Sequence, residues 1–217
     1  MRTAEFAAFP AAARLSLRLP VPEEGALRLP AGLLPSGDQE LLALCAENPG
    51  LRIEREAGGE WIVMPPTGGY SGHWGIRVAA QLQNWADRDG SGVVFGSSTG
   101  FRIPGGLALR APDAAWVRRD RLMALSERER RGFLPLCPDF LIEIASPSDR
   151  RADLDAKMAE YRAAGLRLGW LILPDSRSVE VWTPAETTVL AAPATIFADP
   201  LLPGFVLDLA AIWQPPF

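Results

Sequence analysis

The chain has 217 residues, with 22 basic and 26 acidic side chains and a formal charge of −4. This length fits one domain, or one domain with an extra arm, and the shares of 48% hydrophobic and 22% charged residues are ordinary for a folded protein. The composition excludes disorder as the main state, and the absence of collagen and heptad repeats excludes fibrous and coiled-coil classes.

The first part of the chain predicts an arm and a helix. Prolines recur in residues 1–36, which predicts an irregular arm that ends in a short helix. Ser36 and Gln39 have the spacing of a capping box, so a helix is predicted from here through about Asn48. We take residues 1–50 as this arm with its helix, and 51–217 as a single domain.

The rest of the chain alternates short strands with two amphipathic helices. Strands are predicted over 51–56, 60–64, 91–95, 101–103, 107–109, 114–117, 140–145, 170–173 and 179–182. Helices are predicted over 73–88 and 151–163, with a polar helical excursion over 121–131 and a β-rich tail. The strand–helix–strand unit over 140–173 indicates a mixed α/β domain.

Residues that define redox and zinc sites are scarce. The two cysteines, Cys45 and Cys137, do not indicate a disulfide framework, so a reducing compartment is expected. One histidine and two distant cysteines exclude a tetrahedral zinc site. The chain also shows no secretory signal pattern and no stretch of roughly 18 apolar residues that could span a membrane.

The expected reducing compartment and the lack of these targeting patterns together lead us to expect a cytoplasmic protein.

Glu143 interrupts the apolar strand 140–145. A carboxylate in a buried strand is costly unless it is paired, hydrogen-bonded or bound to a metal. The alternative is an acid on the solvent face of an edge strand. Leu141 and Ala145 share the face of Glu143, which favours a buried, functional acid.

Asp113 opens another predicted strand, directly after Pro112. Because proline suits the first position of a strand, Asp113 is expected at the strand's entrance, where an acid can face a cleft. The alternative is a simple turn residue, since Pro-Asp is a common turn pair.

Lys157 is the only lysine, so 21 of the 22 basic residues are arginine. It shares one face of the predicted helix 151–163 with Asp153 and Tyr161, and the simplest interpretation is a surface pair with Asp153. However, a generic surface cation in this chain would be expected to be arginine. Lysine is a compact charge with a pKa that its surroundings can move, which favours a functional role.

Asp113, Glu143 and Lys157 together suggest metal-assisted hydrolysis. Two carboxylates and a backbone carbonyl suit Mg²⁺, which prefers oxygen ligands and retains waters. A metal can polarise a phosphoryl oxygen and acidify a bound water, and a lysine near that water can stabilise the charge that develops on the phosphate.

The segment 110–182 resembles the Uma-two family of bacterial restriction endonucleases, within the PD-(D/E)XK nuclease superfamily. The residues that carry the resemblance are Arg110 to Asp113, Pro138, Ile142 to Ser148, Arg151, Asp153, Lys157, Tyr161, Gly165 and Trp170 to Asp175. Upstream, Ile62 to Pro66, His73 and Gly96 to Phe101 are also similar, so the resemblance covers roughly residues 50–185.

The resemblance implies a restriction-endonuclease-like core, with a central mixed sheet flanked by helices. It implies that Asp113, Glu143 and the Ile144 carbonyl bind Mg²⁺, or Mn²⁺ in its place. The superfamily lysine expected two residues after Glu143 is Ala145 here, and the family resemblance places the amine on the following helix, at Lys157. His73 would contact the substrate. The implied substrate is nucleic acid, with DNA expected, and sequence-specific cutting of both strands would call for a homodimer.

Three other functions stay open on the sequence. The mild net acidity favours a catalytically silent nucleic-acid-binding or interaction module on the same fold. Asp113 and Glu143 could also be the acid and base of a glycosidase. The segment Gly69 to His73 has a partial likeness to a hydrolase nucleophile elbow, but its fifth position is histidine instead of glycine. His73 itself could be a capping or core residue.

Overall fold

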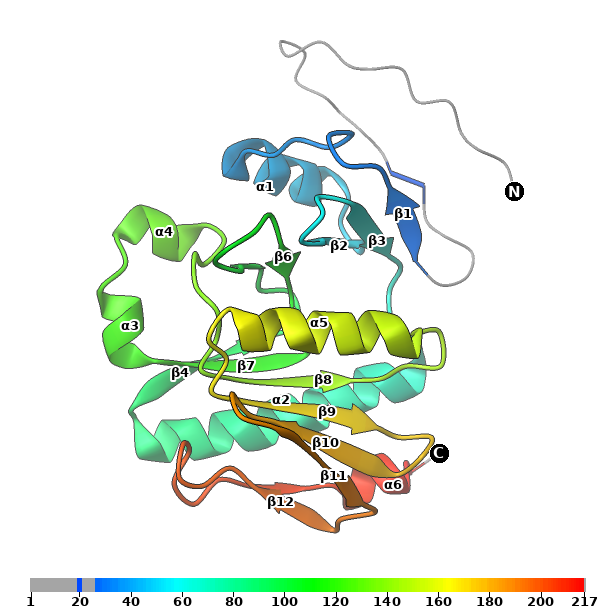
Figure 1. Ribbon diagram of the computed structural model, residues 1–217, viewed down its shortest axis with the longest axis vertical. Coiled ribbons are helices and arrows are strands. Elements are labelled where there is room, and N and C mark those ends of the chain that lie inside the picture. Colours follow the sequence, from blue (N-terminus) through cyan, green and yellow to red (C-terminus); the bar gives the residue numbers. More distant parts are fainter. Residues whose placement is uncertain (1–18, 21–25, 217) are drawn as a thin grey trace.

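The computed structural model describes residues 19–20 and 26–216, and its centre is a six-stranded sheet (Figure 1). The strands are β4 (Gly92–Gly96), β7 (Ala114–Arg118), β8 (Phe140–Ile144), β9 (Leu168–Leu173), β10 (Ser178–Trp182) and β11 (Thr187–Ala191), in the order β11-β10-β9-β8-β7-β4. Only the β8–β9 pair is parallel among the pairs of this sheet. A parallel pair needs a crossover, and α5 (Arg151–Ala163) provides it.

Helices cover both faces of this large sheet. Phe140, Ile142 and Ile144 share a buried cluster with residues of α2 (Gly69–Asp89). Leu141, one residue out of phase, lies in a second cluster with Met158 and Tyr161 of α5. A strand that is buried on both faces usually has apolar residues at consecutive positions, which explains why β8 is apolar except at Glu143. Glu143 has the same strand parity as Leu141 and so lies on the α5 face.

A smaller, antiparallel sheet lies on the other side of α5 (Figure 1). Its strands are β1 (Leu27–Leu29), β2 (Arg52–Arg55), β3 (Trp61–Met64), β5 (Phe101–Arg102) and β6 (Leu109–Arg110), in the order β1-β3-β2-β6-β5. The helix α1 (Asp38–Glu47) packs on it, because Leu41 and Leu44 share a third core with Ile53, Trp61 and Val63. The helix α5 is therefore enclosed between the two sheets.

Shorter elements complete the fold. The helices α3 (Arg119–Met123) and α4 (Glu127–Arg131) follow β7. The pair β12 (Thr195–Phe197) and β13 (Val206–Asp208), with α6 (Ala210–Trp213), packs on the cluster that α2 lines. Among the described residues, no helix combines the length and the apolar character that a membrane span requires.

Most predicted elements are confirmed. The helix predicted over 151–163 is α5 with the same bounds, and the hairpins predicted around residues 57–59 and 104–106 are the pairs β2–β3 and β5–β6. The central mixed sheet flanked by helices confirms the predicted fold class. The polar excursion is two short helices instead of one, because Ser126 begins a new helix with its own capping box.

Three local predictions are wrong. The capping box at Ser36 is absent: α1 begins after Gly37, with no side-chain cap. The second helix begins at Gly69, four residues before the predicted start. Leu27–Leu29, expected in the irregular arm, form β1, because they pair with Trp61–Val63 of β3. Within the predicted arm, residues 1–18 and 21–25 lie outside the described residues.

Candidate active site

The two predicted acids lie side by side at one end of the large sheet. Ala114 of β7 pairs with Ile142 of β8 in an antiparallel register, so Asp113, one residue earlier, lies opposite Glu143, one residue later. Asp113 Oδ2 accepts a 2.8 Å hydrogen bond from the Ile144 backbone N–H. Directly opposite residues of an antiparallel pair point to the same face, and that face is the one covered by α5.

Lys157 meets Glu143 on this face. Glu143 is 3% exposed, and its Oε1 lies 2.8 Å from Lys157 Nζ and accepts a 3.0 Å hydrogen bond from the Tyr161 hydroxyl. Lys157 and Tyr161 are one turn apart on α5. The solvent-face interpretation of Glu143 is therefore wrong. The surface pair of Lys157 with Asp153 is wrong too, because Lys157 is 9% exposed and pairs with Glu143.

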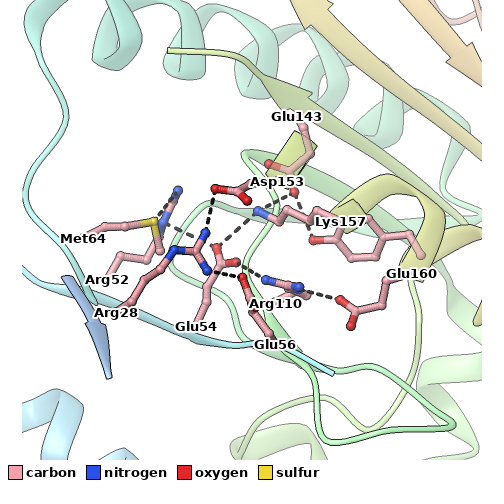
Figure 2. A network of polar contacts seen from close by, with 11 residues as sticks. Arg28, Arg52, Glu54, Glu56, Met64, Arg110, Glu143, Asp153, Lys157 and Glu160 are labelled. Atoms are coloured by element: carbon pink, nitrogen blue, oxygen red, sulfur yellow. Dashed lines mark hydrogen bonds and ion pairs between the residues drawn. The ribbon is translucent and has the colours of Figure 1, made fainter. Parts of the chain in front are cut away.

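The small sheet adds a third carboxylate, Glu54 of β2. Glu54 is 2% exposed, and its Oε1 lies 3.3 Å from Lys157 Nζ. The guanidinium groups of Arg52 and Arg110 lie 3.6 and 3.5 Å from its two oxygens. Figure 2 shows Glu54 among these cations, with Lys157 between Glu54 and Glu143.

Two arginines extend the network to Asp113 and to α5. Arg52 Nη1 lies 3.4 Å from Asp113 Oδ1, and Arg110 Nε donates a 2.6 Å hydrogen bond to Glu160 of α5. Neither Glu54 nor Arg52 was predicted as a site residue from the sequence. The only signal available was that β2 is charged at every position except Ile53, which is also common in a strand that faces solvent.

Burial and neighbouring charge set the protonation of the site. Burial raises the pKa of Glu143 to about 7, and the charges of Asp113 and Glu54 add to this rise against the attraction of Lys157. Burial lowers the pKa of Lys157, but the Glu143 and Glu54 carboxylates outweigh it and leave that pKa raised. Burial, together with the Glu143 charge, raises the pKa of Tyr161 well above its ordinary value. Lys157 is thus an ammonium and Tyr161 a neutral phenol at neutral pH.

The donor set fits a hard divalent cation. Asp113 and Glu143 present carboxylates from neighbouring strands, and the Asp113 charge raises the pKa of Glu143, which is a repulsion that a cation between the two groups would relieve. Among residues 19–20 and 26–216, no group of three or more Asp, Glu, His and Cys side chains has a metal-binding arrangement. Two carboxylates with waters are a usual Mg²⁺ environment.

The structure does not bring His73 into this network. His73 lies on α2, which packs on the cluster of Ile144 and so covers the face of the large sheet opposite to α5. The start of α2 and the carboxyl end of β8 lie at the same end of the sheet in Figure 1. The substrate-binding role of His73 stays a prediction.

The mixed sheet between α2 and α5, with Glu143 on β8 and Asp113 directly before β7, is the arrangement expected of a restriction-endonuclease-like protein. The model of the Uma2 family, described as "Putative restriction endonuclease", matches residues 38–210, and the chain belongs to this family. The resemblance seen in the sequence is thereby confirmed.

The fold is shared with a solved structure. It is the crystal structure of a "putative nuclease belonging to DUF820" from Anabaena variabilis ATCC 29413, with a TM-score of 0.62 and 20% sequence identity, covering 74% of this chain and 89% of that chain. The search of curated proteins gave no significant match.

Proposed function

We propose that the protein is a metal-dependent endonuclease that hydrolyses phosphodiester bonds of nucleic acid, with DNA as the expected substrate and Mg²⁺ or Mn²⁺ as the cofactor. The observation that carries the proposal is the buried Lys157–Glu143 ion pair of 2.8 Å, which lies beside Asp113 at the end of β8. A buried charge pair of this kind is not needed for stability, since apolar residues serve that purpose as well or better. Membership in the Uma2 family favours a nuclease over a glycosidase.

Each residue has a distinct role in this proposal. Asp113, Glu143 and the Ile144 carbonyl would hold the metal, which supplies polarisation of a phosphoryl oxygen and a more acidic bound water. The Lys157 ammonium stabilises the negative charge that grows on the phosphate and orients the attacking water. Its raised pKa keeps it protonated, so it acts as a cation and not as a base. His73 would contact the substrate from the start of α2.

The test is cleavage of a plasmid by the purified protein with Mg²⁺ or Mn²⁺. Replacing Glu143 with Gln removes a ligand charge, so Glu143→Gln should cut at least ~100-fold more slowly than the wild type. Glu180→Gln is the matched control, because Glu180 is also a buried glutamate of the large sheet paired with an arginine, Arg151, at 2.5 Å. This control should cleave like the wild type.

The proposal fails if the wild type leaves the plasmid intact with both metals, or if Glu143→Gln cleaves as fast as the wild type. One observation favours the silent-module alternative: Asp113, Glu143 and Glu54 each already have a cationic partner. Calorimetric titration separates the two functions. Binding of Mg²⁺ or Mn²⁺ that Glu143→Gln abolishes supports the enzyme, and DNA binding without any metal binding supports the module.

A further inference from the structure

Three ion pairs dock one stripe of α5 on the small sheet. Asp153, Lys157 and Glu160 lie on one face of α5, at spacings of four and three residues. Arg28 of β1 binds Asp153 at 2.6 Å, Glu54 of β2 binds Lys157 at 3.3 Å, and Arg110 of β6 binds Glu160 at 2.6 Å. The contact between Glu54 and Lys157 thus has an ion pair on each side, a partly exposed one at Asp153 and a largely buried one at Glu160.

The two acidic partners of Lys157, Glu143 and Glu54, lie on different sheets, and only Glu143 is a proposed metal ligand. Glu143 on β8 is a metal ligand in the proposed function, so its charge is shared with a divalent cation. The same cation repels the Lys157 ammonium nearby. Glu54 on β2 is not a proposed ligand, and its charge remains available to Lys157 when the metal binds. Glu54 itself is surrounded by Lys157, Arg52 and Arg110, so its carboxylate is held in place from three directions.

We propose that Glu54 is a positioning residue, which holds the Lys157 ammonium beside the scissile phosphate while Glu143 is engaged with the metal. The small sheet is then a part of the active site and not an appendage to it. The catalytic consequence rests on the proposed function. The contact itself does not, and it can be measured without any cleavage.

The lone lysine makes the contact directly observable. In ¹⁵N-labelled protein, Lys157 is the only source of a lysine ammonium signal, and such a signal is visible only when hydrogen bonds slow its exchange with water. We expect a Lys157 ammonium signal in the wild type, with and without Mg²⁺. In Glu54→Gln the signal should broaden or vanish, above all with Mg²⁺ present. In the control Glu180→Gln it should remain as in the wild type.

The cleavage assay adds the kinetic consequence. Glu54→Gln should lower kcat by ~10–100-fold, the usual effect of removing a group that orients a metal-site residue. KM should change little, because in this proposal Glu54 acts through Lys157 and not on the substrate. Glu54→Asp, whose shorter side chain cannot reach Lys157, should behave in the same way, and it replaces Glu54→Gln if that variant does not fold.

The outcomes separate the two proposals. An ammonium signal in the folded Glu54 variants that equals that of the wild type overturns the positioning role, as does the absence of any signal from the wild type. Loss of the signal in the Glu54 variants, from a wild type that does not cleave nucleic acid, supports the contact and overturns only the nuclease function.

Discussion

The fold moves the pKa of Glu143 into the neutral range. In the folded chain its pKa is raised to about 7 from an ordinary value of 4.5, with burial as the largest cause. The folded protein therefore binds more protons at this group than the unfolded chain does between these two pH values. The free energy of unfolding must then fall as pH rises through this window.

We expect this fall to amount to at most ~3 kcal/mol between pH 5 and pH 7, from the size of the shift. Glu143→Gln cannot titrate, so its stability should lack this component. Glu54 does not interfere, because its pKa is lowered: burial raises it, but Lys157, Arg52 and Arg110 outweigh burial, so Glu54 loses its contribution only below its ordinary value. Urea unfolding with EDTA at several pH values measures the difference, and equal pH dependence of both proteins would contradict the assignment.

At the residue scale, the sequence predicted Glu143 and Lys157 as site residues and missed Glu54. Glu143 stood out because it interrupts an apolar strand, and Lys157 because every other basic residue is arginine. Glu54 did not stand out in this way, because its neighbours in β2 include two other charged residues. It is buried because α5 covers the face of β2 opposite to Ile53. That contact joins segments far apart in the chain, so the local pattern of a four-residue strand does not contain it.

In the strand β4, the packing of Trp116 against Gly92 leaves no room for a side chain at residue 92. Gly92 pairs with Arg118 of β7, and Trp116, two residues away, lies diagonally across from it. A Cβ added at Gly92 would overlap the indole ring of Trp116, which is 2% exposed. At the other end of the same strand, a Cβ at Gly96 would have nothing within 4 Å.

Gly92→Ala should therefore lower the free energy of unfolding by ~1–3 kcal/mol, the cost of overpacking a filled core. Gly96→Ala is the control within the same strand and should change it by no more than ~0.5 kcal/mol, as for an ordinary surface substitution. Urea unfolding followed by tryptophan fluorescence measures both. Similar stabilities of the two variants would show that Trp116 moves aside at little cost.

At the element scale, the sequence predicted periodic elements well and their ends less well. The helix α5 was predicted with its bounds, because its periodic pattern is closed by Gly165, which adopts a positive φ of 95°. The start of α2 was missed, since its first turn contains Gly69 and Gly72, which carry no apolar periodicity. The capping-box pattern occurs in the structure at Ser126 and Glu129, whereas α1 begins without it, directly after Gly37.

At the scale of the whole molecule, α5 packs against both sheets and connects them. Its Met158 and Tyr161 pack into the core of the large sheet, and its charged stripe binds the small sheet (Figure 2). The small sheet has a core of its own with α1. The position of Glu54 thus depends on a core that contains no residue of the proposed catalytic set.

Leu41 of α1 and Leu202 of the C-terminal region test this dependence, because both are 0% exposed but lie in different cores. Each change to Ala should lower the free energy of unfolding by ~2–5 kcal/mol, the usual cost of a cavity at a buried leucine. At a temperature where both variants are folded, Leu41→Ala should weaken the Lys157 ammonium signal and slow cleavage more than Leu202→Ala does, since Leu41 packs in the cluster of Ile53, the neighbour of Glu54. If Leu202→Ala affects the signal equally, the effect follows from lower global stability. If neither variant affects it, the ion pairs with α5 hold β2 in place without support from the small core.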